Sequence, residues 1–145
     1  MKGQVSTELM VIVALILLVF IPLLALVYFK ANDASSQIAS YEAELTVFRL
    51  AYLTNAVGSL GTNTTVYTDT YIPSNMEALT TNSVGRGGEI VMRLDTPEGE
   101  MEIVEIVQHR IVSDTLMSEP EYGWTRFRIT SEYSGGVAHV EITKE

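Results

Sequence analysis

The sequence predicts an α+β protein in which one long N-terminal helix packs, through its C-terminal half, on a small antiparallel β-sheet. Three observations predict this fold: a continuous apolar run near the N-terminus, a helical apolar stripe after it, and alternating runs rich in Thr, Val, Tyr and Ile in the remainder. A chain of 145 residues allows one ordinary domain or less. We expect a helical stem carrying a β head.

The apolar run extends from Leu9 to Phe29, which is about the 20 residues that a helix needs to cross the hydrocarbon of a bilayer. A secretory signal would have a shorter run and a small-residue cleavage site, whereas this run ends in Tyr28-Phe29-Lys30. The run fits a single-pass membrane anchor better. It also fits a leader peptide that is cleaved before the apolar helix, which then stays in the mature protein. Pro22 lies inside the run and is expected to kink the helix, because proline removes a helical hydrogen bond.

The residues ahead of the run are Met1-Lys2-Gly3-Gln4-Val5-Ser6-Thr7-Glu8. They resemble the class III signal peptide of archaeal type IV pilin-like proteins, in which a short basic leader ending in Gly precedes Gln-x-Ser-x-Glu and a hydrophobic helix. Gln4, Ser6 and Glu8 match the three marker positions, and Lys2-Gly3 matches the leader. The resemblance implies cleavage by a prepilin peptidase between Gly3 and Gln4.

Glu8 is the carboxylate next to the apolar run. A carboxylate in the middle of a helix raises the free energy of membrane insertion by about 2.5–3.5 kcal/mol, and by less near an end. This cost suggests that Glu8 has a partner. The resemblance implies that it pairs with the N-terminal amine of a neighbouring subunit inside a filament. The alternative is that Glu8 lies among lipid headgroups, favoured by the helix dipole.

The helix is expected to continue from about Val5 to about Val57, because no Gly or Pro interrupts residues 31–57. Asn32-Asp33 could instead cap a second helix. Gly58 and Gly61 are expected to stop the helix. Apolar residues recur at helical spacing in this part and predict a face that the β-sheet covers. They are Ile38, Tyr41, Leu45, Phe48 and Tyr52.

From Gly61 onward the pattern favours strands separated by turn residues. In the third predicted strand Met101 and Ile103 are out of phase with Val104 and Ile106, which indicates a bulge or burial on both faces. Trp124 and Tyr122 are expected to pack in the core or at a sheet edge; the alternative is an exposed binding patch. The predicted strands are residues 64–72, 89–94, 100–108, 124–130 and 137–143.

No arrangement of residues indicates an enzyme, a cofactor or a metal. The chain has no cysteine, and neither His109 nor His139 has metal-ligand spacing, so each is expected on the surface or in a strand. A calcium site is conceivable at the Glu cluster of residues 98–105, but a solvated strand face is favoured. A net charge of −9 argues against nucleic acid. Asn63-Thr64-Thr65 is an N-glycosylation sequon, so the protein could be a glycoprotein.

These observations favour a structural subunit of an archaeal type IV pilus-like extracellular filament that serves adhesion. The expected organisation is a cleaved leader (1–3), a transmembrane and filament-core helix (4–30), its amphipathic continuation (31–58) and an extracellular head (59–145). The partners implied are other copies of the chain, the membrane before assembly, the prepilin peptidase, a secretion ATPase and a membrane platform protein. The subunit would move from the cell membrane to a surface filament.

Three alternatives remain open. A minor or tip pilin-like protein, anchored in the membrane as a surface binding protein, would use the same leader. An archaeal flagellar filament protein would have a similar leader, but those proteins usually lack the carboxylate after the cut, so Glu8 argues against one. An enzyme domain on an anchor has no catalytic constellation to support it.

Overall fold

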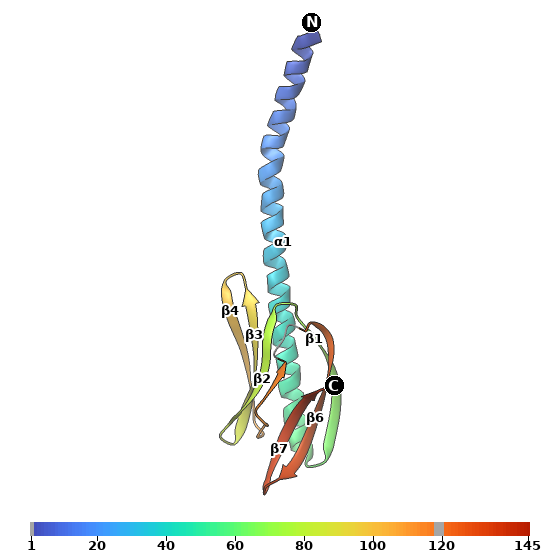
Figure 1. Cartoon of the computed structure of the whole chain (residues 1–145), viewed down its shortest axis with the longest axis vertical. Helices are drawn as coiled ribbons and strands as arrows, with labels where there is room; N and C mark the ends of the chain where they lie inside the picture. The colour runs from blue at the N-terminus through green and yellow to red at the C-terminus, as the bar shows by residue number, and fades with distance from the viewer. Residues whose placement is uncertain (1, 118–120) are drawn as a thin grey trace. The chain divides into compact units, whose positions relative to one another are not determined.

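The computed structural model describes residues 2–117 and 121–145, and the side chains from Ser6 onward within those ranges. It shows one long helix followed by seven strands (Figure 1). The chain divides into two units, one up to Gln37 and one from Ile38 to Glu145. We call them the N-terminal unit and the C-terminal unit. The elements are α1 (Lys2–Leu60), β1 (Thr64–Ile72), β2 (Met76–Val84), β3 (Gly87–Thr96), β4 (Gly99–Val107), β5 (Asp114–Met117), β6 (Gly123–Ser134) and β7 (Val137–Lys144).

Helix α1 is assigned as one element, which confirms a single long helix and excludes a break at Asn32. It also runs through Pro22, whose ring nitrogen has no hydrogen to donate. Gly58 lies inside the helix, so the expectation that it stops the helix was wrong. Gly61 follows the last helical residue with φ of 99°, a conformation that glycine adopts without steric cost.

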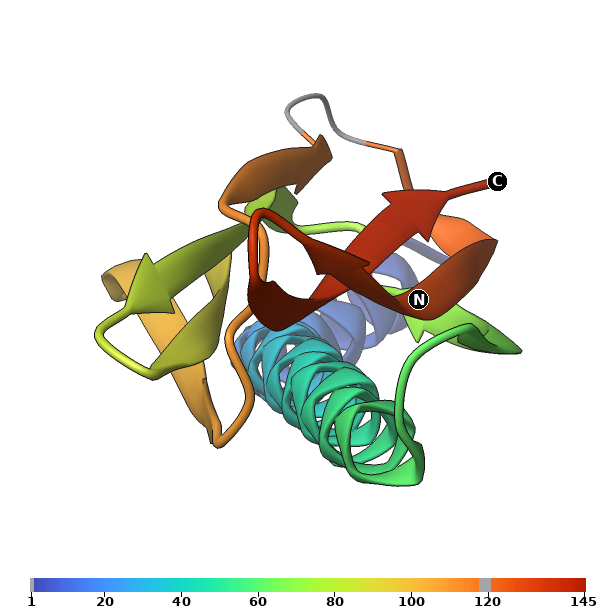
Figure 2. The same ribbon diagram turned by 90° about the horizontal axis from the view of Figure 1, so that it is seen from below.

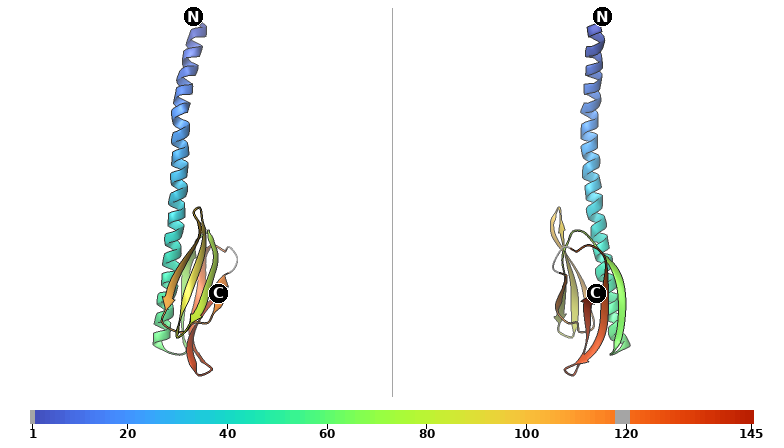
Figure 3. Two further views of the ribbon diagram at one scale, coloured as in Figure 1. Left: turned by 90° about the vertical axis from the view of Figure 1, so that its left-hand side faces the viewer. Right: turned by 45° about the vertical axis from the view of Figure 1, so that its right-hand side comes forward.

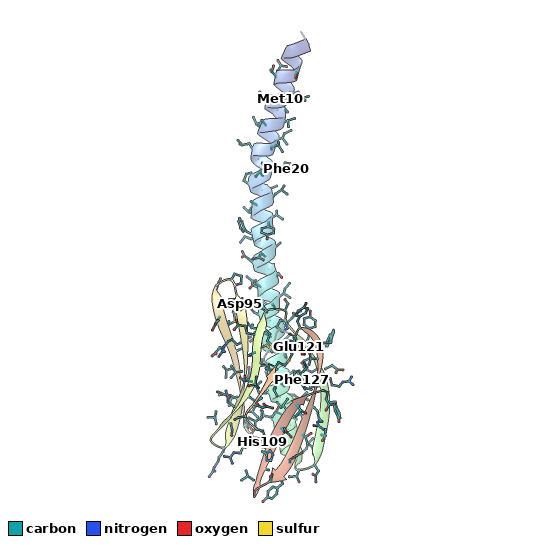
Figure 4. The ribbon with its side chains drawn as sticks, in the orientation of Figure 1. Met10, Phe20, Asp95, His109, Glu121 and Phe127 are labelled. Carbon is teal, nitrogen blue, oxygen red and sulfur yellow. The ribbon has the colours of Figure 1, made fainter. Side chains whose placement is uncertain are left out.

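The N-terminal unit consists, in its described part, of α1 alone. Its large apolar side chains between Leu9 and Phe29 are 46% to 74% exposed, and Met10 and Phe20 project freely from the ribbon (Figure 4). By length and composition this helix can cross a bilayer, and it is compatible with membrane anchoring.

The strands form two antiparallel sheets rather than the single sheet predicted. One has the order β1-β6-β7 and the other β4-β3-β2-β5. Residues 110–112 connect them, because the Val140 N–H donates to the Arg110 carbonyl at 2.8 Å and the Val112 N–H donates to the Val140 carbonyl at 3.0 Å. Both sheets lie beside the C-terminal part of α1, over one side of it (Figures 2 and 3).

All five predicted strands are present, the first with the predicted bounds. Strands β2 and β5 were missed. In β2 a bulge between Met76 and Ala78 spaces the buried Met76 and Leu79 three residues apart, so the sequence lacks strand alternation. Strand β5 has only four residues. The bulge or two-sided burial expected in the third predicted strand was wrong, because β4 pairs with β3 in continuous register and most of its residues are exposed at the sheet edge.

The core of the C-terminal unit forms where the two sheets and α1 meet. Ile90, Met92 and Leu94 of β3 and Phe127 and Ile129 of β6 are fully buried, on the faces that the alternation predicted. In the last strand, Val140 and Ile142 are buried but Ala138 is exposed.

The face of α1 that enters this core is not the predicted one. The buried side chains are smaller: Ala43, Val47, Leu50, Ala51, Thr54 and Val57. The predicted stripe is instead 56% to 68% exposed at all five positions. At 3.6 residues per turn the two sets lie on roughly opposite sides of the helix. The Thr46 hydroxyl, which donates to the Tyr71 carbonyl at 2.7 Å, and the Gln108 N–H, which donates to Asn55 Oδ1 at 2.8 Å, fix the orientation.

The physical reason is packing distance. Ala, Val and Thr side chains let the strand backbones approach the helix closely, whereas a row of Tyr, Leu and Phe would hold the sheets away from it. Apolar periodicity alone cannot distinguish two apolar faces on one helix.

A pair of leucine substitutions tests which face is buried. Leu50→Ala should lower the free energy of unfolding by about 2–5 kcal/mol, because Leu50 is fully buried. Leu45→Ala should change it by no more than about 0.5 kcal/mol, because Leu45 is 68% exposed. Urea unfolding of the full chain in detergent measures both. Equal losses for the two variants would contradict the assigned orientation.

Gly58 is required by the close approach of His109 to α1. A Cβ at position 58 would lie 2.4 Å from His109 Cγ and 2.9 Å from His109 Cβ. Inside a helix, alanine is more stabilising than glycine by about 1 kcal/mol. A clash from overpacking lowers the free energy of unfolding by about 1–3 kcal/mol. We therefore expect Gly58→Ala to destabilise the C-terminal unit by up to about 2 kcal/mol in the same unfolding assay.

The matched background is His109→Gly, which removes the contacting atoms. There Gly58→Ala should cost nothing or stabilise slightly. A loss of the same size in both backgrounds would mean that the His109 contact is not the reason for glycine.

Candidate functional site

The predicted processing motif lies at the start of α1. Ser6 and Glu8 are described and exposed. Gly3 and Gln4 belong to the helix, but their side chains lie outside the described residues, as does Met1 of the predicted leader. The predictions of cleavage between Gly3 and Gln4 and of a kink at Pro22 stay predictions.

The exposed side chain of Glu8 adjoins the first residues of the apolar run. Thr7, Val11 and Ile12 line a hollow with it, and Val11 and Ile12 are themselves exposed. Within the described part of the chain, no ion pair or hydrogen bond joins Glu8 to another side chain. A carboxylate in apolar surroundings is costly unless a cation or hydrogen-bond donor reaches it. One copy of the described chain therefore leaves this charge uncompensated.

Asn63, the acceptor of the sequon, lies in the turn between α1 and β1. Its side chain is exposed, so it is sterically open to modification. Its φ of 64° and the 2.8 Å hydrogen bond from its N–H to the Ser131 carbonyl give asparagine a structural reason to be there, because Asn tolerates this conformation better than most residues. Glycosylation at Asn63 stays a prediction.

An aromatic cluster lies on the outer face of the three-stranded sheet. Trp124 is 75% exposed and Tyr122 is 69% exposed, so the expectation that they pack in the core was wrong. Trp124 lies at the end of the sheet where β6 pairs with β1 and β7 does not reach. Trp124 meets Tyr71 edge to face, with 5.8 Å between ring centroids. An exposed tryptophan beside tyrosines is typical of surfaces that contact other molecules.

The same sheet face carries a paired charge. Arg126 donates to both carboxylate oxygens of Asp69, at 2.8 Å and 3.1 Å. This hydrogen bonding holds the pKa of Asp69 below its ordinary value and the pKa of Arg126 above its own. On the other sheet the side-chain hydrogen bond to Glu102 raises the pKa of Arg93 in the same way. Both pairs are exposed and are expected to add little to stability.

The remaining candidate groups do not assemble into a reactive centre. His109 shares a 3.1 Å hydrogen bond with the Ser59 hydroxyl, and His139 lies opposite Glu132 in the β6–β7 pairing. Of the Glu cluster, Glu102 pairs with Arg93 and Glu98 is exposed at the β3–β4 turn. Within residues 6–117 and 121–145, no group of three His, Cys, Asp or Glu side chains is placed to hold a metal.

The stripe on the second part of α1 was predicted to lie under the β-sheet, so its exposure was not predicted. Tyr41, Leu45 and Phe48 of this stripe line a hollow of about 500 Å³, together with Glu44 and with Glu105 of β4. The signal that could have found it is the second apolar row, with Ala43, Val47, Leu50, Thr54 and Val57 at spacings of three and four.

Comparison with protein-family models, with curated proteins and with solved structures finds no match to this chain. The layout itself, a long apolar N-terminal helix followed by antiparallel sheets, is compatible with a pilin-like fold. Two groups of exposed large apolar side chains lie on α1: those of the N-terminal unit and those of the outward stripe of the C-terminal unit.

Proposed function

We propose that this protein is the structural subunit of an archaeal type IV pilus-like extracellular filament that polymerises through helix α1. One observation carries the proposal: an uncovered apolar helix holds an unpaired carboxylate, Glu8, at its beginning. A bilayer would cover the apolar side chains but would not neutralise this charge. A bundle of identical helices, each with a free N-terminal amine, would do both.

The leader motif supports the origin of that amine. If a prepilin peptidase cuts between Gly3 and Gln4, the new amine lies four residues before Glu8 on the same helix. A neighbouring copy displaced along the bundle would bring its own amine to this carboxylate. Inside a helical bundle the attraction between opposite charges is much stronger than in water.

The mechanism is mechanical rather than chemical. The membrane stores the processed subunit, and a secretion ATPase acting with a platform protein extracts it. The apolar helices then exchange lipid neighbours for one another, while the acidic C-terminal units face water. The polymer is held together by many copies of one helix–helix contact.

Adhesion is the role we assign to the filament. The exposed Trp124, whose ring meets Tyr71, offers a surface for contact with an external partner, and Tyr122, two residues earlier in the sequence, is also exposed. The same cluster would serve the second candidate, a minor or tip pilin-like protein that stays anchored as a surface binding protein. Labelling of filaments along their length, rather than at one end, distinguishes the first candidate from the second.

Replacement of Glu8 tests the proposal. Glu8→Ala should leave cleavage intact, so that the mature chain still begins at Gln4, but should strongly reduce the yield of surface filaments. Losing one partner of a shielded ion pair costs about 3–5 kcal/mol, because the other charge is left unpaired. N-terminal sequencing and the amount of filament sheared from cells are the two readouts.

The matched control is Asp33→Ala, which removes an exposed carboxylate from the same helix outside the apolar run. It should assemble normally. A native chain that begins at Met1 would favour a plain membrane anchor. Unaltered filaments from Glu8→Ala would remove the role that we assign to this carboxylate.

A further inference from the structure

The stripe on the outward face of α1 in the C-terminal unit has no cover within the described chain. Ile38, Tyr41, Leu45, Phe48 and Tyr52 are all more than half exposed. Contiguous apolar patches of this kind on a soluble unit mark contact surfaces. Three of the five side chains are aromatic, the type that dominates the energetics of protein contacts.

At the middle of this stripe is a hollow bounded by two elements. Tyr41, Leu45 and Phe48 come from α1, and Glu105 comes from β4. Its volume of about 500 Å³ lies within the range of sites that accept large side chains or small ligands. We call it the helix–β4 groove.

Two carboxylates, Glu44 and Glu105, stand at this groove. Glu105 lies on the core-facing side of β4, between the partly buried Ile103 and the buried Val107. An inward charge on an edge strand can also serve to prevent edge-to-edge pairing. Within the described residues neither carboxylate has an ion-pair partner, so two like charges adjoin an apolar hollow with no cation between them. Such a site attracts a cation from outside the copy.

The described chain has few free cations to offer. Arg93, Arg126, Arg128 and Lys144 are already paired with carboxylates. Arg49 is near Asp69, whose pKa it helps to lower, whereas Arg86 and Arg110 both line a separate hollow beside His109. Lys30 directly follows Tyr28 and Phe29, which are 71% and 65% exposed and meet edge to face. The segment 28–30 therefore combines two free aromatic rings with a free cation.

We propose that the helix–β4 groove receives the Tyr28-Phe29-Lys30 segment of a second copy of this chain. An aromatic ring fills the apolar hollow, and the Lys30 ammonium lies between the carboxylates of Glu44 and Glu105. A membrane surface is a poorer occupant, because anionic headgroups would meet two carboxylates. The inference rests on the proposed polymerisation and names a contact of it that is distinct from the Glu8 contact.

Disulfide mapping tests the contact directly, because the chain has no cysteine of its own. Phe29→Cys and Leu45→Cys are combined in one chain, and surface filaments are oxidised before electrophoresis without reductant. Within one copy the two positions are more than four turns apart on one helix, about 24 Å along its axis, too far for a bond. Each copy then carries one cysteine in the 28–30 segment and one in the groove. Disulfides between successive copies are therefore expected to give a ladder of dimers and larger multimers.

The matched control pairs Phe29→Cys with Tyr67→Cys, since Tyr67 is 58% exposed on β1 and outside the groove. This control and each single cysteine should give no ladder. In an independent test, Lys30→Glu should reduce filament yield at least tenfold, and adding Glu44→Lys and Glu105→Lys should restore it. The charge exchange keeps the inference testable if the cysteine pair assembles poorly.

The outcomes separate the two proposals. Filaments that form normally, with no more cross-linking for the 29/45 pair than for the control pair and no effect of Lys30→Glu, would overturn the groove contact and leave the filament proposal standing. Cells in which the chain is present but gives neither filaments nor a cross-linked ladder would overturn both. A ladder confined to membranes that carry no filaments would show a second copy in the groove without polymerisation, and would contradict the filament proposal alone.

Discussion

Every large apolar side chain of α1 has to be withdrawn from water, and the described chain covers only one side of the last part of this helix. The positions of the two sheets follow from this constraint. The two sheets cover the small-residue face from Ala43 to Val57. The large apolar side chains of the N-terminal unit and of the opposite stripe are exposed in the described chain. Within the described chain, the hydrophobic effect therefore stabilises the C-terminal unit through this one face of α1.

The division of residue sizes between the two faces of α1 follows from what each face has to contact. A sheet backbone approaches a helix closely only where side chains are small, as at Ala43 and Ala51. Helices packing on helices interdigitate ridges of larger side chains, which suits the outward Tyr, Leu and Phe. Charges pair within a sheet at Arg126 and Asp69, whereas Glu8 and Glu44 of α1 and Glu105 of β4 lack an ion-pair partner in the described chain.

Much of this fold could be predicted from the sequence. The long helix, the boundaries of β1 and the buried faces of β3 and β6 follow from uninterrupted helical propensity and from alternation. The buried face of α1 could not, because two apolar rows of equal period differ only in side-chain size, and the tertiary packing decides between them. Strand β2 could not be predicted, because its bulge breaks the alternation. The outward position of Trp124 could have been predicted, because it lies three residues from the buried Phe127 and so on the other face of β6. The motif around Glu8 could be identified from the sequence because its residues are consecutive. The helix–β4 groove could not, because it joins residues from distant parts of the chain.

Electron cryomicroscopy of filaments sheared from the cell surface tests the central claim, that the apolar helix becomes the filament core, most directly. The account predicts a helical reconstruction in which residues 4–30 of many copies bundle along the axis, each chain begins at Gln4, and the C-terminal units lie outside. Filaments built without this chain, or a chain found only in the membrane with its first residues intact, would contradict it.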